Sequence, residues 1–115
     1  MPYRVERALG VDRDLDLIFD HLAGAYVDFG ETRLEALTHA AVRIERIQGQ
    51  MGALARQPHQ GTLRPDLGAQ VRSVTKTRAV FYFEIDEVRA VVRILAVFFG
   101  GQDHIRQMLT RLLRD

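Results

Sequence analysis

The side chains that could carry chemistry in this chain are histidines, one serine, a few carboxylates and many arginines. The four histidines are scattered, and none has a second histidine at helical spacing to share a metal ion: His21, His39, His59 and His104. Ser73 is the only serine, and it lacks the Gly-x-Ser-x-Gly surround of a nucleophile elbow. The chain has no cysteine, so a thiolate metal site is impossible, and we expect neither a metal site nor a cofactor.

The charged residues point to binding rather than to acid–base catalysis. Glu84, Asp86 and Glu87 cluster, but acidic residues are common at hairpin turns. Lys76 is the only lysine among 16 basic residues, and the planar fork of arginine suits carboxylates and phosphates. A high arginine content is also typical of GC-rich genomes. The net charge of +1 is far below that of a dedicated nucleic-acid binder, so direct nucleic-acid binding is expected only within a larger complex.

Length and composition indicate one folded domain over residues 1–115. The chain is 47% hydrophobic and 27% charged, which favours a packed core over disorder. No apolar run is long enough to span a bilayer, and the first residues lack the apolar middle of a signal peptide. We therefore expect a cytoplasmic protein with no membrane partner.

Hydrophobic periodicity predicts a strand and two helices in the first half. Residues 3–9 alternate as a short strand that ends at Gly10. A helix with Asp12 as its N-cap follows and ends before Gly30, which suits the C′ position. A second helix ends before Pro58. The connection between the helices is short, so they should form an antiparallel hairpin.

The second half contains three runs rich in β-branched and aromatic residues. They follow a long connector marked by glycine and proline, and span residues 71–77, 78–85 and 88–99. Short turns near Lys76-Thr77 and at Asp86-Glu87 require antiparallel neighbours. Alternation in the last run predicts one apolar face that meets the hairpin, made of Ala90, Val92, Ile94, Ala96 and Phe98. Arg89 and Arg93 should lie on the opposite face.

This order of elements predicts the α+β class. An N-terminal strand and an antiparallel helical hairpin pack on one side of an antiparallel β-sheet, and a short C-terminal helix follows.

One combination of residues is typical of a known family. The connector ends in Arg64-Pro65-x-Leu67-Gly68-x-x-x-Arg72-Ser73. Next come Arg78, Phe81 and Tyr82, then Ile85-Asp86, and then a run ending at Gly100. In this order, and with these elements, nearly the whole chain resembles the RelE/ParE superfamily of bacterial type II toxins.

The resemblance implies a toxin held inactive by a cognate antitoxin. The binding segment of such antitoxins is largely unstructured and wraps the helices and sheet edge of the toxin. RelE-like members cut messenger RNA in the ribosomal A site, whereas ParE-like members inhibit DNA gyrase and lack that active site.

The residues after the last run favour the ParE-like alternative. RNA cleavage needs an acid, a base and cationic groups around one phosphate. RelE-like members carry basic residues just after the last strand, where this chain has only Gly100, Gly101 and Gln102. We therefore expect a gyrase inhibitor rather than an enzyme. In the alternative, a RelE-like endoribonuclease, the catalytic candidates are Arg78, Arg93 and His104; an inactive binding module of the same fold is the third interpretation.

The C-terminal segment has two interpretations. Asp103 can cap a helix whose apolar stripe is Ile105, Met108, Leu109, Leu112 and Leu113. This helix could close the core, which we favour, or swing on Gly100-Gly101 and offer its stripe to a partner. Arg106 and Arg111 are expected on the solvent side in both cases. The candidate residues for binding an antitoxin are Arg72, Arg78, Arg106, Leu109 and Leu113, since leucines supply apolar area and guanidinium groups orient carboxylates.

Overall fold

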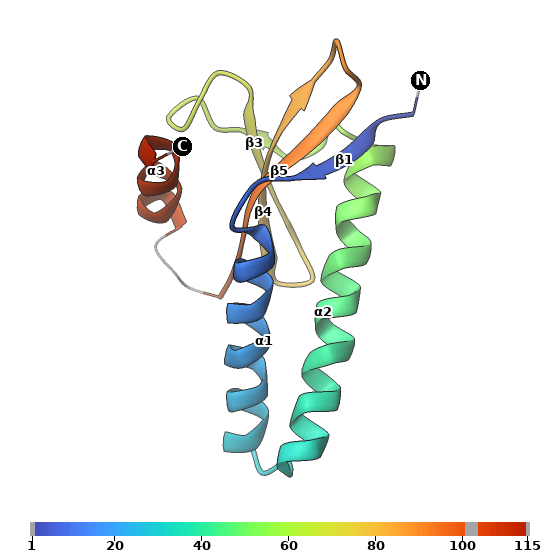
Figure 1. Cartoon of the computed structure of the whole chain (residues 1–115), viewed down its shortest axis with the longest axis vertical. Coiled ribbons are helices and arrows are strands. Elements are labelled where there is room, and N and C mark those ends of the chain that lie inside the picture. The colour runs from blue at the N-terminus through green and yellow to red at the C-terminus, as the bar shows by residue number, and fades with distance from the viewer. Residues whose placement is uncertain (1, 101–103, 115) are drawn as a thin grey trace.

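The computed structural model describes residues 2–100 and 104–114, and its elements confirm the α+β prediction (Figure 1). In chain order they are β1 (Arg4–Arg7), α1 (Val11–Asp28), α2 (Arg33–Arg56), β2 (Thr62–Leu63), β3 (Val71–Lys76), β4 (Ala79–Asp86), β5 (Val91–Phe99) and α3 (His104–Arg114). The connector predicted between residues 59 and 70 contains the two-residue strand β2.

The two long helices form the predicted hairpin, with one correction at its start. Gly10, not Asp12, is the N-cap of α1, with a φ of 94° that glycine adopts without strain. Asp12 instead accepts a hydrogen bond from Arg7 at 2.8 Å. Thr32 and Glu35 form a capping box at the start of α2, which fixes the sharp connection after Gly30.

The sheet is mixed rather than purely antiparallel. Its strand order is β1-β5-β4-β3-β2, and every pair is antiparallel except β1 with β5. The helical hairpin connects β1, at one edge of the sheet, to β2, at the other edge.

The turn before β5 is longer than the sequence predicted. Asp86 pairs with Val91, so β5 begins at residue 91 rather than at 88. The Asp86 carboxylate accepts a hydrogen bond from the Arg89 backbone N–H at 3.0 Å. Ala90 has a φ of 53°, which closes the turn and removes this residue from the sheet face on which it was expected.

A bulge in β5 changes which side chains meet the hairpin. Tyr82 pairs with Ala96 but Phe83 pairs with Ile94, so Leu95 is an extra residue in β5. Beyond it the alternation reverses. Ala96 and Phe98, expected against the hairpin, therefore lie on the other face, while Val92 and Ile94 keep their predicted side.

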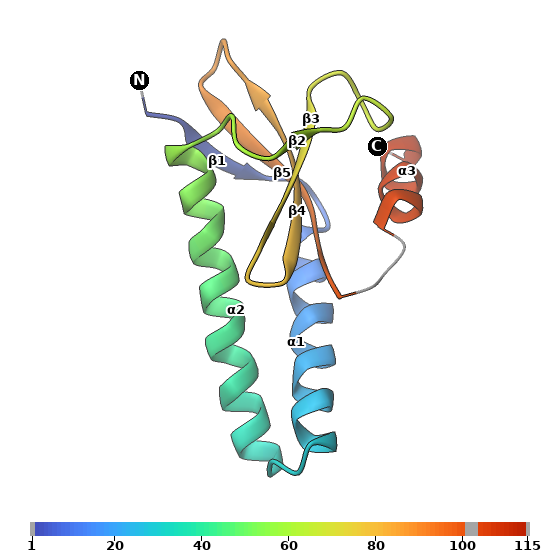
Figure 2. The ribbon, with the colours of Figure 1, turned by 180° about the vertical axis from the view of Figure 1, so that it is seen from behind.

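The hairpin projects beyond the sheet (Figures 1 and 2). Arg43 marks where contact with the sheet ends: it donates to the Thr77 carbonyl at 3.5 Å and lies over the Phe99 ring. We call residues 22–42, beyond this contact, the hairpin tip. Among the described residues, no helix is both long and apolar enough to cross a bilayer.

Candidate partner-binding surfaces

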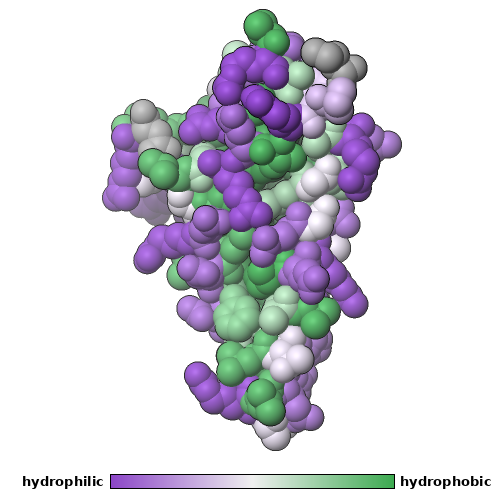
Figure 3. All heavy atoms as spheres, turned by 45° about the vertical axis from the view of Figure 1, so that its right-hand side comes forward, coloured by the Kyte–Doolittle hydropathy of each residue, from purple (hydrophilic) through white to green (hydrophobic). Residues whose placement is uncertain are grey.

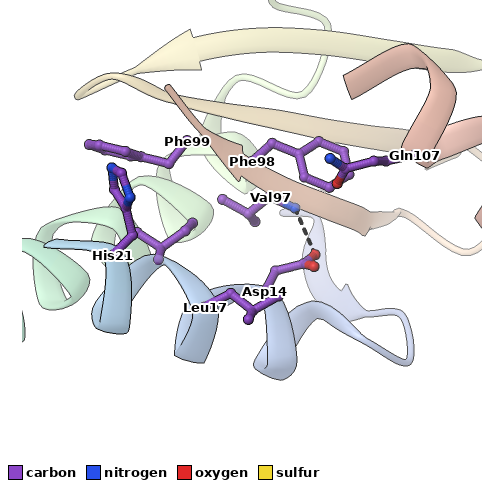
Figure 4. A pocket seen from close by; sticks show the side chains of 8 residues that line it. Asp14, Leu17, His21, Val97, Phe98, Phe99 and Gln107 are labelled. Carbon is purple, nitrogen blue, oxygen red and sulfur yellow. Dashed lines mark hydrogen bonds between the residues drawn. The ribbon is translucent and has the colours of Figure 1, made fainter. Parts of the chain in front are cut away.

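One edge of β5 is completed by side chains. β1 pairs with β5 only as far as Ile94, so the β5 backbone beyond that residue has no neighbouring strand on this side. Asp14 of α1 accepts a hydrogen bond from the Val97 N–H at 3.0 Å (Figure 4). Arg111 of α3 donates to the Leu95 carbonyl at 3.1 Å. These two side chains thus satisfy backbone groups that β1 does not reach.

Asp14 and Arg111 also form an ion pair that joins α1 to α3. Both terminal guanidinium nitrogens of Arg111 donate to the Asp14 carboxylate, one of them at 2.8 Å, and Arg111 also donates to the Gly10 carbonyl. Asp14 is 4% exposed, and this burial raises the pKa of its carboxyl even though the hydrogen bonds from Arg111 and Val97 act in the opposite direction. The prediction that Arg111 lies on the solvent side is therefore wrong.

The helix α3 lies on the face of β5 opposite α1 (Figure 4). The ring of His104 stacks on Phe98 with 5.0 Å between centroids, and Met108 is buried. The leucines of the predicted stripe are exposed, Leu112 among them at 36%. The two candidate binding residues, Leu109 and Leu113, are 41% and 88% exposed. The interpretation that these two leucines complete the core is therefore wrong, and α3 presents them to solvent.

The candidate arginines are spread over several elements. Arg72 of β3 is half-buried and donates to the carbonyls of His59 and Gln60, so it supports the connector. Arg78 is exposed in the turn between β3 and β4, where its φ is 67°. Arg106 is exposed on α3.

The structure does not bring the three candidate catalytic residues together. Arg78 adjoins Ala79, which pairs with Phe99, whereas Arg93 pairs with Glu84. Five residues of strand separate these positions, which is about 17 Å. His104 contacts Phe98 near the Arg78 end. The three side chains therefore have no common phosphate-sized site.

Arg93 lies in an open, mainly acidic hollow. This hollow, about 580 Å³, is lined by Glu6, Gln70, Glu84, Ile85, Asp86, Glu87, Arg89, Val91 and Arg93. Its four carboxylates outnumber its two guanidinium groups. Arg93 is 3.9 Å from Glu84 and Arg89 is 3.0 Å from Glu6, so both arginines already have carboxylate partners. Within residues 2–100 and 104–114, no group of acidic or histidine side chains could hold a metal ion.

The hairpin carries a groove on the side away from the sheet. Two hollows of about 320 Å³ lie between α1 and α2. One is lined by Leu15, Phe19 and Ile44 with polar neighbours, and the other by Ala23, Gly24, Val27, Ala36 and Leu37 with charged neighbours. Figure 3 shows hydrophobic residues running along the helices, flanked by hydrophilic ones. We call this surface the outer groove.

Sequence reasoning missed both the outer groove and the buried Asp14. The signal for Asp14 is its position: Val11, Leu15 and Ile18 share its helix face, and all three are buried. A carboxylate within such a stripe needs a buried partner. The groove has a weaker signal, the small residues Ala23 and Gly24 in an otherwise bulky apolar stripe.

No protein-family model and no curated protein sequence matches this chain. Solved structures do. A chain of the chromosomal ParDE toxin–antitoxin system from P. aeruginosa superposes with a TM-score of 0.65 at 21% identity, over 86% of this chain and 97% of that one. A chain of the toxin–antitoxin complex RelBE2 from Mycobacterium tuberculosis superposes with a TM-score of 0.52 at 21% identity, over 87% of this chain and 100% of that one.

A double mutant of the E. coli toxin RelE in the free state gives a TM-score of 0.61 at 8% identity, over 98% of this chain and 99% of that one. At these identities the likeness establishes the fold. The fold that the predicted resemblance to the RelE/ParE superfamily implies is therefore confirmed.

Proposed function

We propose that this chain is the toxin of a bacterial type II toxin–antitoxin system, neutralised by a cognate antitoxin and ParE-like in its action on DNA gyrase. The observation that carries the proposal is the fold shared with chains of a ParDE and a RelBE2 complex, over at least 86% of this chain in each case.

The placement of the basic residues supports gyrase inhibition over RNA cleavage. A ribonuclease must surround one phosphate with an acid, a base and cations. Here Arg78 and Arg93 lie at opposite ends of the β4–β5 ladder, and Arg93 already has Glu84 as its partner. The acidic hollow around Arg93 would repel a nucleic-acid backbone.

Two surfaces are proposed for the antitoxin. The outer groove offers an apolar floor, and the exposed leucines Leu109 and Leu113 offer a second apolar contact on α3. A disordered segment must bury enough apolar area to offset its ordering entropy, and both surfaces supply such area. Arg72, Arg78 and Arg106 remain the proposed partners for antitoxin carboxylates.

Expression in bacteria tests the toxin assignment. Expression of the chain alone should stop growth, and co-expression of the protein encoded by the adjacent reading frame should restore it. Normal growth in cells that contain high, verified levels of the folded chain would count against the proposal.

The target is tested with purified components. The chain should block supercoiling by gyrase and leave translation in a purified ribosomal system intact. Ribosome-dependent cleavage of messenger RNA that is abolished by Arg78→Ala or His104→Ala would instead assign the chain to the endoribonucleases.

A further inference from the structure

Four cationic side chains gather where the turn between β3 and β4 meets α2. The Arg43 guanidinium donates to the Thr77 carbonyl at 3.5 Å, and the neighbours of Thr77 along the chain are Lys76 and Arg78. Figures 1 and 2 show this turn beside the middle of α2. Arg46 lies three residues after Arg43, so the two arginines are neighbours on the helix surface. We call this group the basic corner: Arg43, Arg46, Lys76 and Arg78.

The cations of the basic corner lack carboxylate partners. In the part of the chain that the structure describes, none of the four takes part in an ion pair, and Arg46 and Arg78 are exposed. The carboxylates at the start of α2 are engaged elsewhere, because Glu31 pairs with His39 at 3.1 Å and Glu35 belongs to the capping box. Like charges held this close repel each other. A polyanion laid over the corner relieves that repulsion.

The turn holds its arginine in a strained backbone conformation. Thr77 has a φ of 52° and Arg78 a φ of 67°, in the left-handed region where hairpin turns favour asparagine or glycine. Residues strained in this way occur preferentially at functional positions. Glycine at position 78 would relieve the strain and remove the cation, so Arg78 contributes more to binding than to folding.

An exposed ring adjoins the basic corner on α2. His39 lies one helical turn before Arg43, which also donates to the Tyr26 hydroxyl at 3.2 Å. The ring of His39 stacks on Tyr26, with 3.7 Å between centroids and 5° between the planes. Its side chain is 47% exposed, and Tyr26 covers one face, so the exposed area lies on the other face and the ring edge. Cations beside an open ring face are how many proteins bind single-stranded nucleic acids.

We propose that the basic corner binds a nucleic-acid strand, with phosphates on its four cations and a base stacked on His39. The inference goes beyond the proposed function, because it depends on neither gyrase nor an antitoxin. An acidic peptide segment offers charges for the cations but no flat ring for the imidazole, so a nucleic acid matches the surface better. Because the net charge is only +1, the corner serves as a second contact within a complex that already holds DNA or RNA nearby.

The salt dependence of oligonucleotide binding measures how many phosphates the chain contacts. Fluorescence anisotropy gives the Kd for labelled single strands of about twelve nucleotides, one of DNA and one of RNA with the same sequence. Four cations predict a slope of log affinity against log salt of about −2.8, which is a loss of about 20-fold between about 25 and 75 mM salt. Binding of either strand with this slope supports the inference. A preference for DNA fits gyrase as the target, and a preference for RNA fits the ribosome.

Two matched double variants locate the phosphate contacts. Arg46→Gln with Lys76→Gln removes two side chains that make no ion pair or hydrogen bond among the described residues, and should bring the slope to about −1.4. Arg13→Gln with Arg56→Gln removes the same charge from exposed positions outside the corner, and should leave the slope unchanged.

Two single variants separate binding from folding. Arg78→Gly should reduce the steepness of the slope by about 0.7 and keep or raise the melting temperature, since glycine adopts this φ without strain. A folding defect would instead lower the melting temperature. The unmodified chain should bind a normal strand at least about fivefold more tightly than an abasic strand with the same phosphates, and His39→Ala should abolish this preference.

Three results contradict the inference. Equal weakening by the two double variants would show that net charge alone attracts the strand. Equal affinity for normal and abasic strands would remove the role of His39. An acidic peptide of equal charge that binds as tightly as the oligonucleotides would assign the corner to a protein partner. Because these assays do not depend on toxicity, a chain that binds through the corner but permits growth would refute the proposed function alone.

Discussion

Arg111 and Asp14, 97 residues apart in the chain, form a hydrogen-bonded ion pair that fastens α3 to the start of α1. The pair also completes the edge of β5, because Asp14 accepts a hydrogen bond from the Val97 N–H and Arg111 donates one to the Leu95 carbonyl. Removal of either side chain leaves a charge and a backbone group without their partners.

Asp14→Ala and Arg111→Ala should each lower the free energy of unfolding by about 3–5 kcal/mol, the usual loss when one member of a buried pair is removed. The double variant should lose much less than the sum of the two single losses, because it leaves no charge unpaired. Urea unfolding of the four proteins gives the coupling energy. Additive losses would show that the two residues act independently.

Leu109→Ala and Leu113→Ala should weaken the complex with the proposed antitoxin and leave the melting temperature of the free chain nearly unchanged. Both side chains are exposed in the free chain, whereas full burial of a leucine at an interface contributes about 1.5–3 kcal/mol. Calorimetric titration and thermal unfolding of the same variants separate the two effects. Met108→Ala is the control that should lower the melting temperature, since Met108 is buried.

Tyr3→Phe should raise the pKa of Glu87. The Tyr3 hydroxyl donates to Glu87 at 2.6 Å, and this bond, followed by the contact with His59, holds the pKa of Glu87 below its usual value. A lowered pKa in the folded state stabilises the fold above the ordinary pKa, and that stability is lost as the pH falls through the folded value. Loss of the hydrogen bond from Tyr3 should move the pKa of Glu87 in the folded chain back toward its ordinary value.

Carboxyl NMR titration of both proteins measures this change. Glu35 serves as the internal control, because its lowered pKa comes from the capping box with Thr32 and should not respond to Tyr3→Phe. An unchanged Glu87 titration in the variant would contradict the assigned cause.

Gly61→Ala should destabilise the chain, and Gly49→Ala should stabilise it. Gly61 has a φ of 80°, and a Cβ there would lie 2.4 Å from the carbonyl oxygen of Ser73, the residue of β3 that pairs with Thr62 of β2. Strain of this kind costs about 1–3 kcal/mol. Gly49 is helical with open space around it, so alanine should gain about 0.5–1 kcal/mol. Urea unfolding of both variants measures whether each substitution lowers or raises the free energy of unfolding.

The elements could be predicted from the sequence because their signals are local. Periodicity gave α1 and α2, and Gly30 and Pro58 marked their ends. The sheet faces could not be fully predicted, because Leu95 lies in a continuous apolar run in which an extra residue leaves no trace in the alternation. The first-turn position of Asp14 is also favoured by the helix dipole, so this position does not by itself reveal that the carboxylate is buried. The partner of Asp14 is Arg111, which lies too far along the chain for a rule based on sequence spacing to predict the contact.

The pairing of β1 with β5 sets an order of events during synthesis. Among the strands that the structure describes, only β5 lies beside β1, and residues 4–7 pair with residues 91–94. The first strand therefore has no neighbour in this sheet until the last strand has been made. The helical hairpin, whose contacts are local, can form while the chain still grows, whereas the sheet must close afterwards. Under the proposed function, an antitoxin present in the cell would meet the hairpin before the chain is complete, and so before a finished toxin exists.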